Sequence, residues 1–167
     1  IEGLALAAFN TMRIMCIDPL LKELIYLVTR DEARHVTFGV NYLEYIVKHL
    51  SAEEIEERAQ FAYEACVIMR ERLIATEVFA EFGWDVEVSR KHMLDSSVMA
   101  YFNKFLFTRI MPNLARIGLL TEKVRPKFEA LGILEYENLV SDGDIDWATL
   151  SQALYQDPQP QTTPKAA

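Results

Sequence analysis

The chain has 167 residues, 51% of them hydrophobic, and a formal net charge of −8, which predicts one domain with a buried core. An acidic chain is a poor partner for nucleic acid or an anionic membrane, because both favour a basic surface. The two cysteines are far apart and form no CxxC pair, so we expect no disulfide framework and a reducing, cytoplasmic location.

Charged residues interrupt every apolar run before it reaches the roughly 20 residues of a membrane-spanning helix, so no membrane span is expected. The sequence starts without the basic segment and cleavage site of a signal peptide. Its first residues, IEGLALAAFNTMRIMC, already have helical character but no capping residue before them. We therefore expect a chain that begins within a helix, as a fragment of a longer protein.

Almost the whole chain is predicted to be helical, because glycine and proline cluster at breaks and no stretch alternates with the period of a strand. The first helix is expected to end near Cys16. Asp18 and Pro19, a capping residue and a proline suited to the first helical position, then begin a long helix. That helix is expected to reach Leu50.

Three further helical segments are predicted after the long helix. Residues 51–54 (SAEE) have the pattern of a capping box, which begins a helix that ends near Gly83. The next segment covers 86–119, where Pro112 is expected to kink or break the helix. A shorter segment covers 121–131 and ends at the following glycine.

The last part of the chain has weaker signals. The cluster at 141–144 (SDGD) is typical of a turn, and a short helix is expected within 146–155. The proline-rich, polar segment at 156–167 is expected to be disordered. Residues 1–155 are therefore predicted to form one all-α domain, a helical bundle.

The stretch TRDEARHVTFG at 29–39 sets two metal-binding residue types among apolar neighbours. Glu32 and His35 are three positions apart, about 60° around a helix axis, so they share one helix face. Apolar residues one turn away on either side predict that this face points inward. A buried carboxylate needs a partner, and a metal ion held by both side chains would be one.

A second carboxylate is expected at the same height as Glu32 along a hairpin of the first two helices. Glu2 is the only acidic residue of the first helix and lies 15 residues before a reversal near Ile17, whereas Glu32 lies 15 residues after it. An antiparallel hairpin would then present one Glu from one helix and Glu-x-x-His from the next. This is half of the ligand set of ferritin-like di-iron and di-manganese proteins, and such oxygen-rich sites with imidazole suit iron or manganese.

The same residues resemble a known family. TRDEARHVTFG is similar to the last ligand helix of the ferritin-like superfamily, in the branch of the class I ribonucleotide reductase small subunit, the ligand-binding oxidases and the di-iron N-oxygenases. The resemblance covers residues 1–50 and implies that Glu2, Glu32 and His35 are metal ligands. It also implies that Asp31 orients a ligand histidine without touching the metal.

The resemblance further implies a ferritin-like bundle and a dioxygen-activating oxidoreductase with two metal ions, Fe/Fe or Mn/Fe. Such a centre oxidises a small apolar substrate or generates a protein radical. The first ligand helix and a second Glu-x-x-His are missing here, so the other ligand hairpin is expected from the same polypeptide or from a second chain, and a homodimer is expected. Val28 stands where the N-oxygenases carry an extra histidine, which disfavours that subgroup.

Three alternatives stay open at this point. The site could oxidise and store iron, although the long extension after the last ligand helix favours an enzyme. The chain could be a scaffold without metal, in which Glu32 and His35 lie on a surface face next to Arg34. Two copies could also pair by two-fold symmetry and supply two Glu and two Glu-x-x-His.

Other notable residues favour structural roles. The apolar stretch 98–111 is expected to be a buried helix or a subunit interface. The acidic run at 53–57 is expected at a helix N-terminus, where it complements the helix dipole. His49 is expected at a helix end and His92 on a solvated face.

Overall fold

A computed structural model describes residues 2–72 and 74–144 of the chain. Over these residues the secondary structure consists of α-helices and short 3-10 helices, without strands, which confirms the predicted all-α class. The helix predicted within 146–155 and the disordered segment predicted at 156–167 lie outside the described residues. Within those residues, no helix is both long and apolar enough to cross a membrane.

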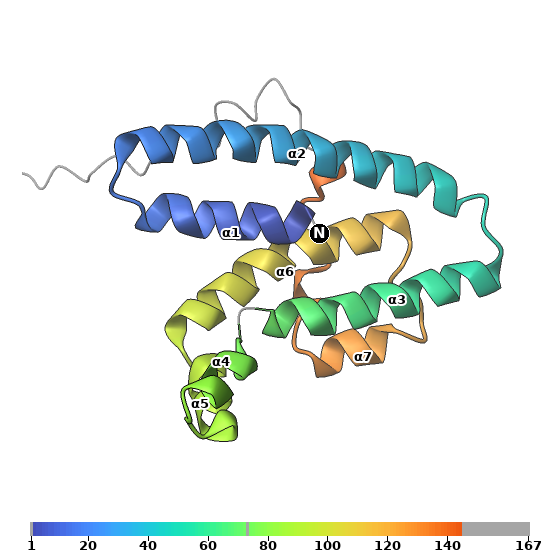
Figure 1. The fold of residues 1–167 in the computed structure, drawn as a ribbon. Coiled ribbons are helices and arrows are strands. Elements are labelled where there is room, and N and C mark those ends of the chain that lie inside the picture. The colour runs from blue at the N-terminus through green and yellow to red at the C-terminus, as the bar shows by residue number, and fades with distance from the viewer. Residues whose placement is uncertain (1, 73, 145–167) are drawn as a thin grey trace, which may run out of the picture.

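The first two helices form an antiparallel hairpin (Figure 1). Helix α1 (Glu2–Met15) ends one residue before the predicted Cys16. Helix α2 (Pro19–Val47) begins as predicted, because the Asp18 side chain accepts a hydrogen bond from the Leu21 amide at 2.8 Å. It ends three residues before the expected Leu50.

Helix α3 (Ala52–Glu71) begins with the predicted capping box. The Ser51 hydroxyl accepts from the Glu54 amide at 3.2 Å, and the Glu54 carboxylate accepts from the Ser51 amide at 2.8 Å. The predicted extension to Gly83 is wrong, since α3 ends at Glu71 and a separate helix α4 (Thr76–Glu81) follows. The break has a tertiary cause: Ile74 and Phe79 pack with Met99 in a small cluster of their own.

The predicted helix at 86–119 is two helices, α5 (Val86–Leu94) and α6 (Ser97–Ile117). Ser96 separates them, because its side chain accepts from the Met99 amide at 3.2 Å and caps α6. Pro112 does not break the helix, since α6 continues through it. The prediction of a buried helix is met on one face of α6, whose buried residues are Met99, Phe102, Leu106, Phe107, Met111, Pro112, Asn113 and Ile117. Val98 and Tyr101 are exposed, at 55% and 47%, and the alternative of a subunit interface stays a prediction.

Helix α7 (Arg125–Ala130) is shorter than the predicted segment 121–131. It is followed by Gly132 at a φ of +71°, a conformation that favours glycine, so the predicted end is confirmed. Two 3-10 helices complete the described chain, η1 (Leu134–Tyr136) and η2 (Asp142–Asp144). The second contains the predicted turn, although Asp142 is buried.

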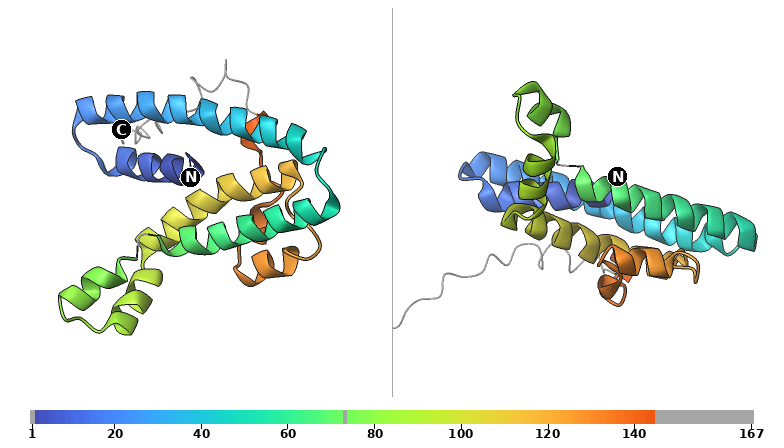
Figure 2. Two further views of the ribbon diagram at one scale, coloured as in Figure 1. Left: turned by 45° about the vertical axis from the view of Figure 1, so that its right-hand side comes forward. Right: turned by 90° about the horizontal axis from the view of Figure 1, so that it is seen from below.

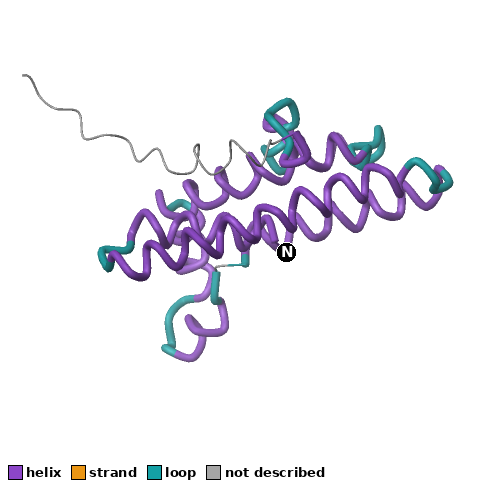
Figure 3. Tube along the Cα trace, turned by 90° about the horizontal axis from the view of Figure 1, so that it is seen from above, coloured by secondary structure: helices purple, strands orange, loops and turns teal. Residues whose placement is uncertain are grey.

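Helix α6 lies between the α1–α2 hairpin and α3, and α4 and α5 project away from the rest (Figures 2 and 3). One core cluster joins these helices. Its largest fully buried members are Phe102, Phe107, Phe128, Leu106, Met111, Val124 and Cys66. The hairpin rests on α6 through one side only, and no described helix covers the outer side of α2 (Figure 1).

Candidate metal-ligand face on helix α2

Glu32 and His35 lie in the middle of α2 and share one face, as predicted. The His35 Nδ1 atom is 3.4 Å from the Glu32 Oε2 atom. The expectation that this face points inward is not met within the described chain, because the His35 side chain is 65% exposed and that of Glu32 is 29% exposed. The pair lies at the surface of the hairpin.

The separation of these two atoms suits a shared metal ion. Two ligand atoms that are each about 2.1 Å from a metal, at an angle of about 90–110°, lie roughly 3.0–3.5 Å apart. The observed 3.4 Å falls within this interval and is longer than a good hydrogen bond. One carboxylate oxygen and one imidazole nitrogen of α2 can therefore contact the same ion.

The outer side of α2 is exposed yet largely apolar. The buried residues of the helix lie on the side that faces α1 and α6 and are Ile25, Tyr26, Ala33, Val36, Thr37, Val40 and Val47. On the opposite side, residues spaced by three or four positions form one stripe. We call it the outer stripe; it consists of Leu20, Leu24, Leu27, Asp31, His35, Phe38, Tyr42 and Tyr45.

Apolar side chains of the outer stripe are open to solvent. Leu20 is 79% exposed, Phe38 is 72% exposed and Tyr45 is 61% exposed. His35 belongs to this stripe, and Glu32 lies on its flank. An apolar helix face of this length is typical of a surface that another protein segment covers, and covering it would bury the Glu32–His35 pair.

Asp31 contacts arginines of its own helix. One carboxylate oxygen lies 3.0 Å from an Arg34 nitrogen and 3.9 Å from the Arg30 Nε atom. The Asp31 side chain is 59% exposed. Its implied role, to orient a ligand histidine of another segment, stays a prediction.

Glu2 is the first residue of α1, but its side chain lies outside what the structure describes. The start of α1 lies opposite the middle of α2, where Glu32 is found (Figure 1). At this end the hairpin rests closely on α6, since a Cβ atom at Gly3 would lie 3.4 Å from Ile110 Cγ1. The participation of Glu2 in a metal site stays a prediction.

Among the side chains that are described, no three His, Cys, Asp or Glu residues lie close enough together to hold a metal ion. The described part of the chain thus brings two donors together on α2. A di-metal site of the ferritin-like kind needs four carboxylates and two histidines. The pair would supply two of these donors, and a complete site of this kind would need the others from elsewhere, with Glu2 as the predicted third ligand.

Two hollows near the hairpin do not include the pair. One of about 380 Å³ is lined by Arg34, Thr37, Phe38 and Asn41, most of which lie on the flank of α2 opposite Glu32. The other, of about 240 Å³, is mainly apolar and lies between the end of α1 and the start of α6. Its lining residues are Thr11, Ile14, Met15, Ser97, Val98 and Tyr101.

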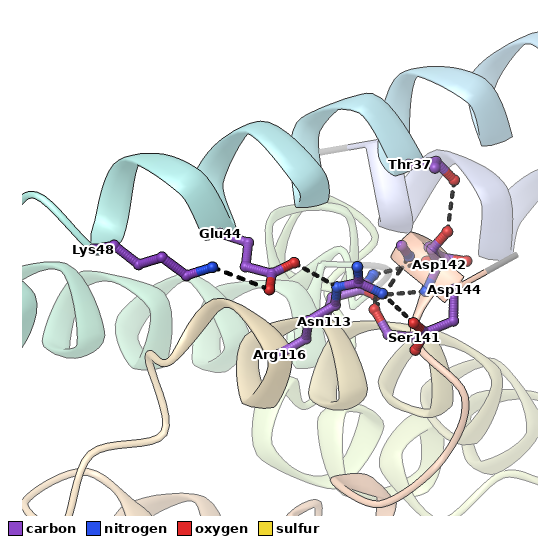
Figure 4. Close-up of polar contacts among 9 residues, drawn as sticks. Thr37, Glu44, Lys48, Asn113, Arg116, Ser141, Asp142 and Asp144 are labelled. Carbon is purple, nitrogen blue, oxygen red and sulfur yellow. Dashed lines mark hydrogen bonds and ion pairs between the residues drawn. The ribbon is translucent and has the colours of Figure 1, made fainter.

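Sequence reasoning missed a buried polar cluster around Asp142 (Figure 4). Asp142 is 2% exposed. Its carboxylate accepts a hydrogen bond from the Asn113 side chain at 2.7 Å and forms an ion pair with Arg109. Its carbonyl oxygen accepts from the Thr37 hydroxyl at 2.7 Å, and Ser141 donates to Asn113 at 2.9 Å. We call these five residues the Asp142 cluster; they fasten η2 to α2 and α6.

An ion-pair group next to this cluster links the same elements. Arg116 of α6 donates to Glu44 of α2 at 2.8 Å and pairs with Asp144 of η2. The hydrogen bond from Arg116 lowers the pKa of Glu44. Gly143 permits this approach, since a Cβ atom there would lie 2.6 Å from the guanidinium carbon of Arg116. The turn at 141–144 was visible in the sequence, but these distant partners were not.

Comparison with known proteins identifies no relative of the chain. No family model matches the chain, and neither a curated protein nor a solved structure matches it. The residues of α1 and α2 and the surface around them are therefore the features that indicate a function.

Proposed function

We propose that the chain provides half of the metal centre of a dioxygen-activating di-metal carboxylate oxidoreductase of the ferritin-like type. One observation carries the proposal: the Glu32–His35 pair, spaced for a shared ion, lies within the uncovered apolar face of α2. A segment that covers this face would bury both side chains. A buried carboxylate beside an imidazole is costly unless a cation or another donor compensates for the lost water.

Glu32, His35 and Glu2 are the proposed ligands, and Fe/Fe or Mn/Fe is the proposed metal content. The carboxylates reduce the charge of the ions, and a neutral His35 imidazole binds through one ring nitrogen. When bound, the ions supply the electrons that activate dioxygen for the oxidation of a small apolar substrate or for radical formation. The apolar residues of the outer stripe, once covered, exclude water from the pair.

A helical scaffold without metal is the second candidate. It is favoured by the exposure of His35 and by the Asp31–Arg34 pair, an arrangement that ordinary solvated helix surfaces also carry. Iron storage would use the same ligands. It differs in that iron is oxidised and retained without an organic substrate.

Metal binding by the full chain tests the proposal directly. We expect Co(II), used as a spectroscopic substitute, and Fe(II) under anaerobic conditions to bind the wild-type protein. Glu32→Ala and His35→Ala should each lower the affinity by at least about tenfold, because each removes a direct ligand. Glu23→Ala and His49→Ala are matched controls, since they remove the same kinds of group from exposed positions on or next to α2.

The outcomes separate the candidates. Equal metal affinity in wild type, Glu32→Ala and His35→Ala would contradict the proposed centre and favour the scaffold. Ligand-dependent binding followed by accumulation of many ferric ions per chain would favour storage. Ligand-dependent binding with about one or two ions per chain and continued dioxygen consumption in the presence of a reductant would support the oxidoreductase.

A further inference from the structure

Helices α4 and α5 form a small unit that projects from the rest of the fold (Figures 1 and 2). The unit has its own core, in which Phe79 packs with Ile74 and Met99. Two aromatic side chains at the turn between the helices stay outside this core, since Phe82 is 68% exposed and Trp84 is 57% exposed. The Trp84 ring stacks against both phenylalanine rings, with centroid distances of 6.1 Å to Phe79 and 5.6 Å to Phe82. These contacts hold in place an aromatic surface that is open to solvent.

The turn and the helix residues next to it carry negative charge only. The stretch TEVFAEFGWDVEVS at 76–89 contains four acidic residues and neither lysine nor arginine. We call one group of exposed residues around this turn the aromatic–acidic patch; it consists of Glu77, Val78, Glu81, Phe82, Trp84, Asp85 and Glu87. Val78 and Phe82 are four positions apart, as are Glu77 and Glu81, so an apolar row and an acidic row run side by side along α4.

Within the part of the chain that the structure describes, none of the four carboxylates of the patch forms an ion pair. Three of them suit their helices. Asp85 caps α5 by accepting from the Val88 amide at 2.9 Å, and Glu77 and Glu87 lie in the first turns of α4 and α5, where the helix dipole favours a carboxylate. Glu81 has no such role, because it lies in the last turn of α4 and four positions from the like charge of Glu77. A cationic partner would compensate for this unfavourable placement.

The charge of the patch selects among the molecules that could cover it. A second copy of the chain is a poor occupant, because the patch would meet its own negative charge. Residues 145–167 contain one lysine and no arginine, so they offer little positive charge either. Nucleic acid and anionic membranes are repelled for the same reason. Lysine and arginine side chains, in contrast, bind both to carboxylates and to the faces of aromatic rings.

We propose that the aromatic–acidic patch binds a short basic, amphipathic segment of another protein. Lysine or arginine side chains of that segment lie over the Trp84 ring and next to Glu81, and its apolar side chains pack on Phe82 and Val78. No residue of the patch belongs to the Glu32–His35 pair or to the outer stripe of α2. The inference is therefore independent of whether α2 binds a metal ion.

The fluorescence of Trp84 tests binding at the patch itself. The chain has two tryptophans, and Trp147→Phe leaves Trp84 as the only one. We expect a synthetic amphipathic peptide of leucine and lysine to shift the Trp84 emission of the full chain to shorter wavelength, because the peptide removes water from the indole. The same peptide with glutamate in place of lysine should cause no shift. No shift with the lysine peptide, or equal shifts with both peptides, would overturn the inference, as would a shift that grows with protein concentration alone.

Charge variants separate an effect on binding from an effect on stability. Glu77→Gln combined with Glu81→Gln should raise the dissociation constant of the lysine peptide about fivefold at low salt. It should not lower the melting temperature, since it removes a like-charge pair. Glu53→Gln combined with Glu57→Gln is the matched control, because these two glutamates are exposed at the same spacing on α3. Equal weakening by the two pairs would show a general attraction to an acidic chain and overturn the inference.

Truncation of an aromatic side chain should have the larger effect. Phe82→Ala should raise the dissociation constant of the lysine peptide at least about tenfold, whereas Phe61→Ala should not, although Phe61 is 70% exposed on α3. Phe82→Ala also removes a ring contact of Trp84, so its folding is checked by circular dichroism. If it unfolds, the two glutamine pairs, which keep every ring in place, decide the outcome. A folded Phe82→Ala variant that binds like the wild type would overturn the inference.

Discussion

Helix α2 carries two polar clusters, and they differ in how completely the chain satisfies them. In the Asp142 cluster, an amide and a guanidinium of α6 contact the buried carboxylate of Asp142, and a hydroxyl of α2 donates to its carbonyl oxygen. In the other cluster, Glu32 and His35 contact each other, and the open side of the pair faces solvent. A polar group that only holds the fold is provided with its partners in the same chain. The open pair lacks such partners, so it is the better candidate for an external ligand.

The surroundings of the two clusters support the same distinction. The Asp142 cluster lies where α2 meets α6, next to buried core residues. The Glu32–His35 pair lies on the opposite side of the helix, next to exposed leucine and aromatic side chains. Exposed charge is ordinary in a solvated helix, but a long exposed apolar stripe beside it is not. One side of α2 therefore stabilises the fold, and the other side is the one at which we propose that a ligand binds.

Removal of Asp142 should have the largest effect on stability. Asp142→Ala leaves Arg109 and Asn113 without their partner in a buried setting, and we expect a loss of about 3 kcal/mol in the free energy of unfolding. Asp144→Ala is the control, because the Asp144 side chain is 62% exposed, and its effect should stay below about 1 kcal/mol. Chemical denaturation measures both. Equal losses would contradict the role given to the Asp142 cluster.

Metal addition should stabilise the protein through the open pair. At a free metal concentration about 100 times the dissociation constant, binding to the folded state adds about 2.7 kcal/mol. We expect Co(II) or Mn(II) to raise the melting temperature of the wild type, and at the same metal concentration His35→Ala should show at most about half of that increase. His49→Ala should respond like the wild type. A similar increase in all three proteins would indicate nonspecific binding and contradict the assignment of the pair.

The sequence predicted the α1–α2 hairpin and the spacing of the Glu32–His35 pair better than it predicted the Asp142 cluster. The Asp18–Pro19 start, the capping box at Ser51 and the spacing of Glu32 and His35 are local signals, and each is confirmed in position. The break after Glu71 depends on packing around Met99, which no local pattern reveals. The break before Ser97 has a local cause, the Ser96 cap, but a serine alone did not distinguish a cap from a position inside a helix.

The predicted inward orientation of the Glu32–His35 face failed for a related reason. Apolar neighbours indicate that a helix face is meant to be covered, but they do not say by which segment. The Asp142 cluster was missed because its partners are separated by as many as 105 positions in the chain. Turn chemistry predicted a turn at 141–144, whereas the burial of Asp142 depends on contacts with Thr37 and Asn113.

Loss of the Thr37 hydroxyl tests how much the contact from α2 contributes to the Asp142 cluster. Thr37→Val keeps the shape of the side chain but removes the hydrogen bond to the Asp142 carbonyl oxygen, so we expect a loss of about 1 kcal/mol. Thr29→Val is a matched control on the same helix. Its hydroxyl donates at 2.7 Å to the Ile25 carbonyl, which lies within the helix. A loss of the same size in Thr29→Val would show that any threonine on α2 behaves this way.

The smallest effect on stability is expected from removal of the Glu44 carboxylate, and this effect should depend on pH. The hydrogen bond from Arg116 lowers the pKa of Glu44 in the folded protein. A lowered folded-state pKa means that the contribution is present above the unfolded pKa of about 4.3 and is lost as the pH falls through the folded value. Wild type should therefore exceed Glu44→Gln in stability near pH 7, and the difference should shrink in acid. Because Glu44 is open to solvent, added salt should weaken the difference. A difference that is constant with pH would contradict a stabilising ion pair between Glu44 and Arg116.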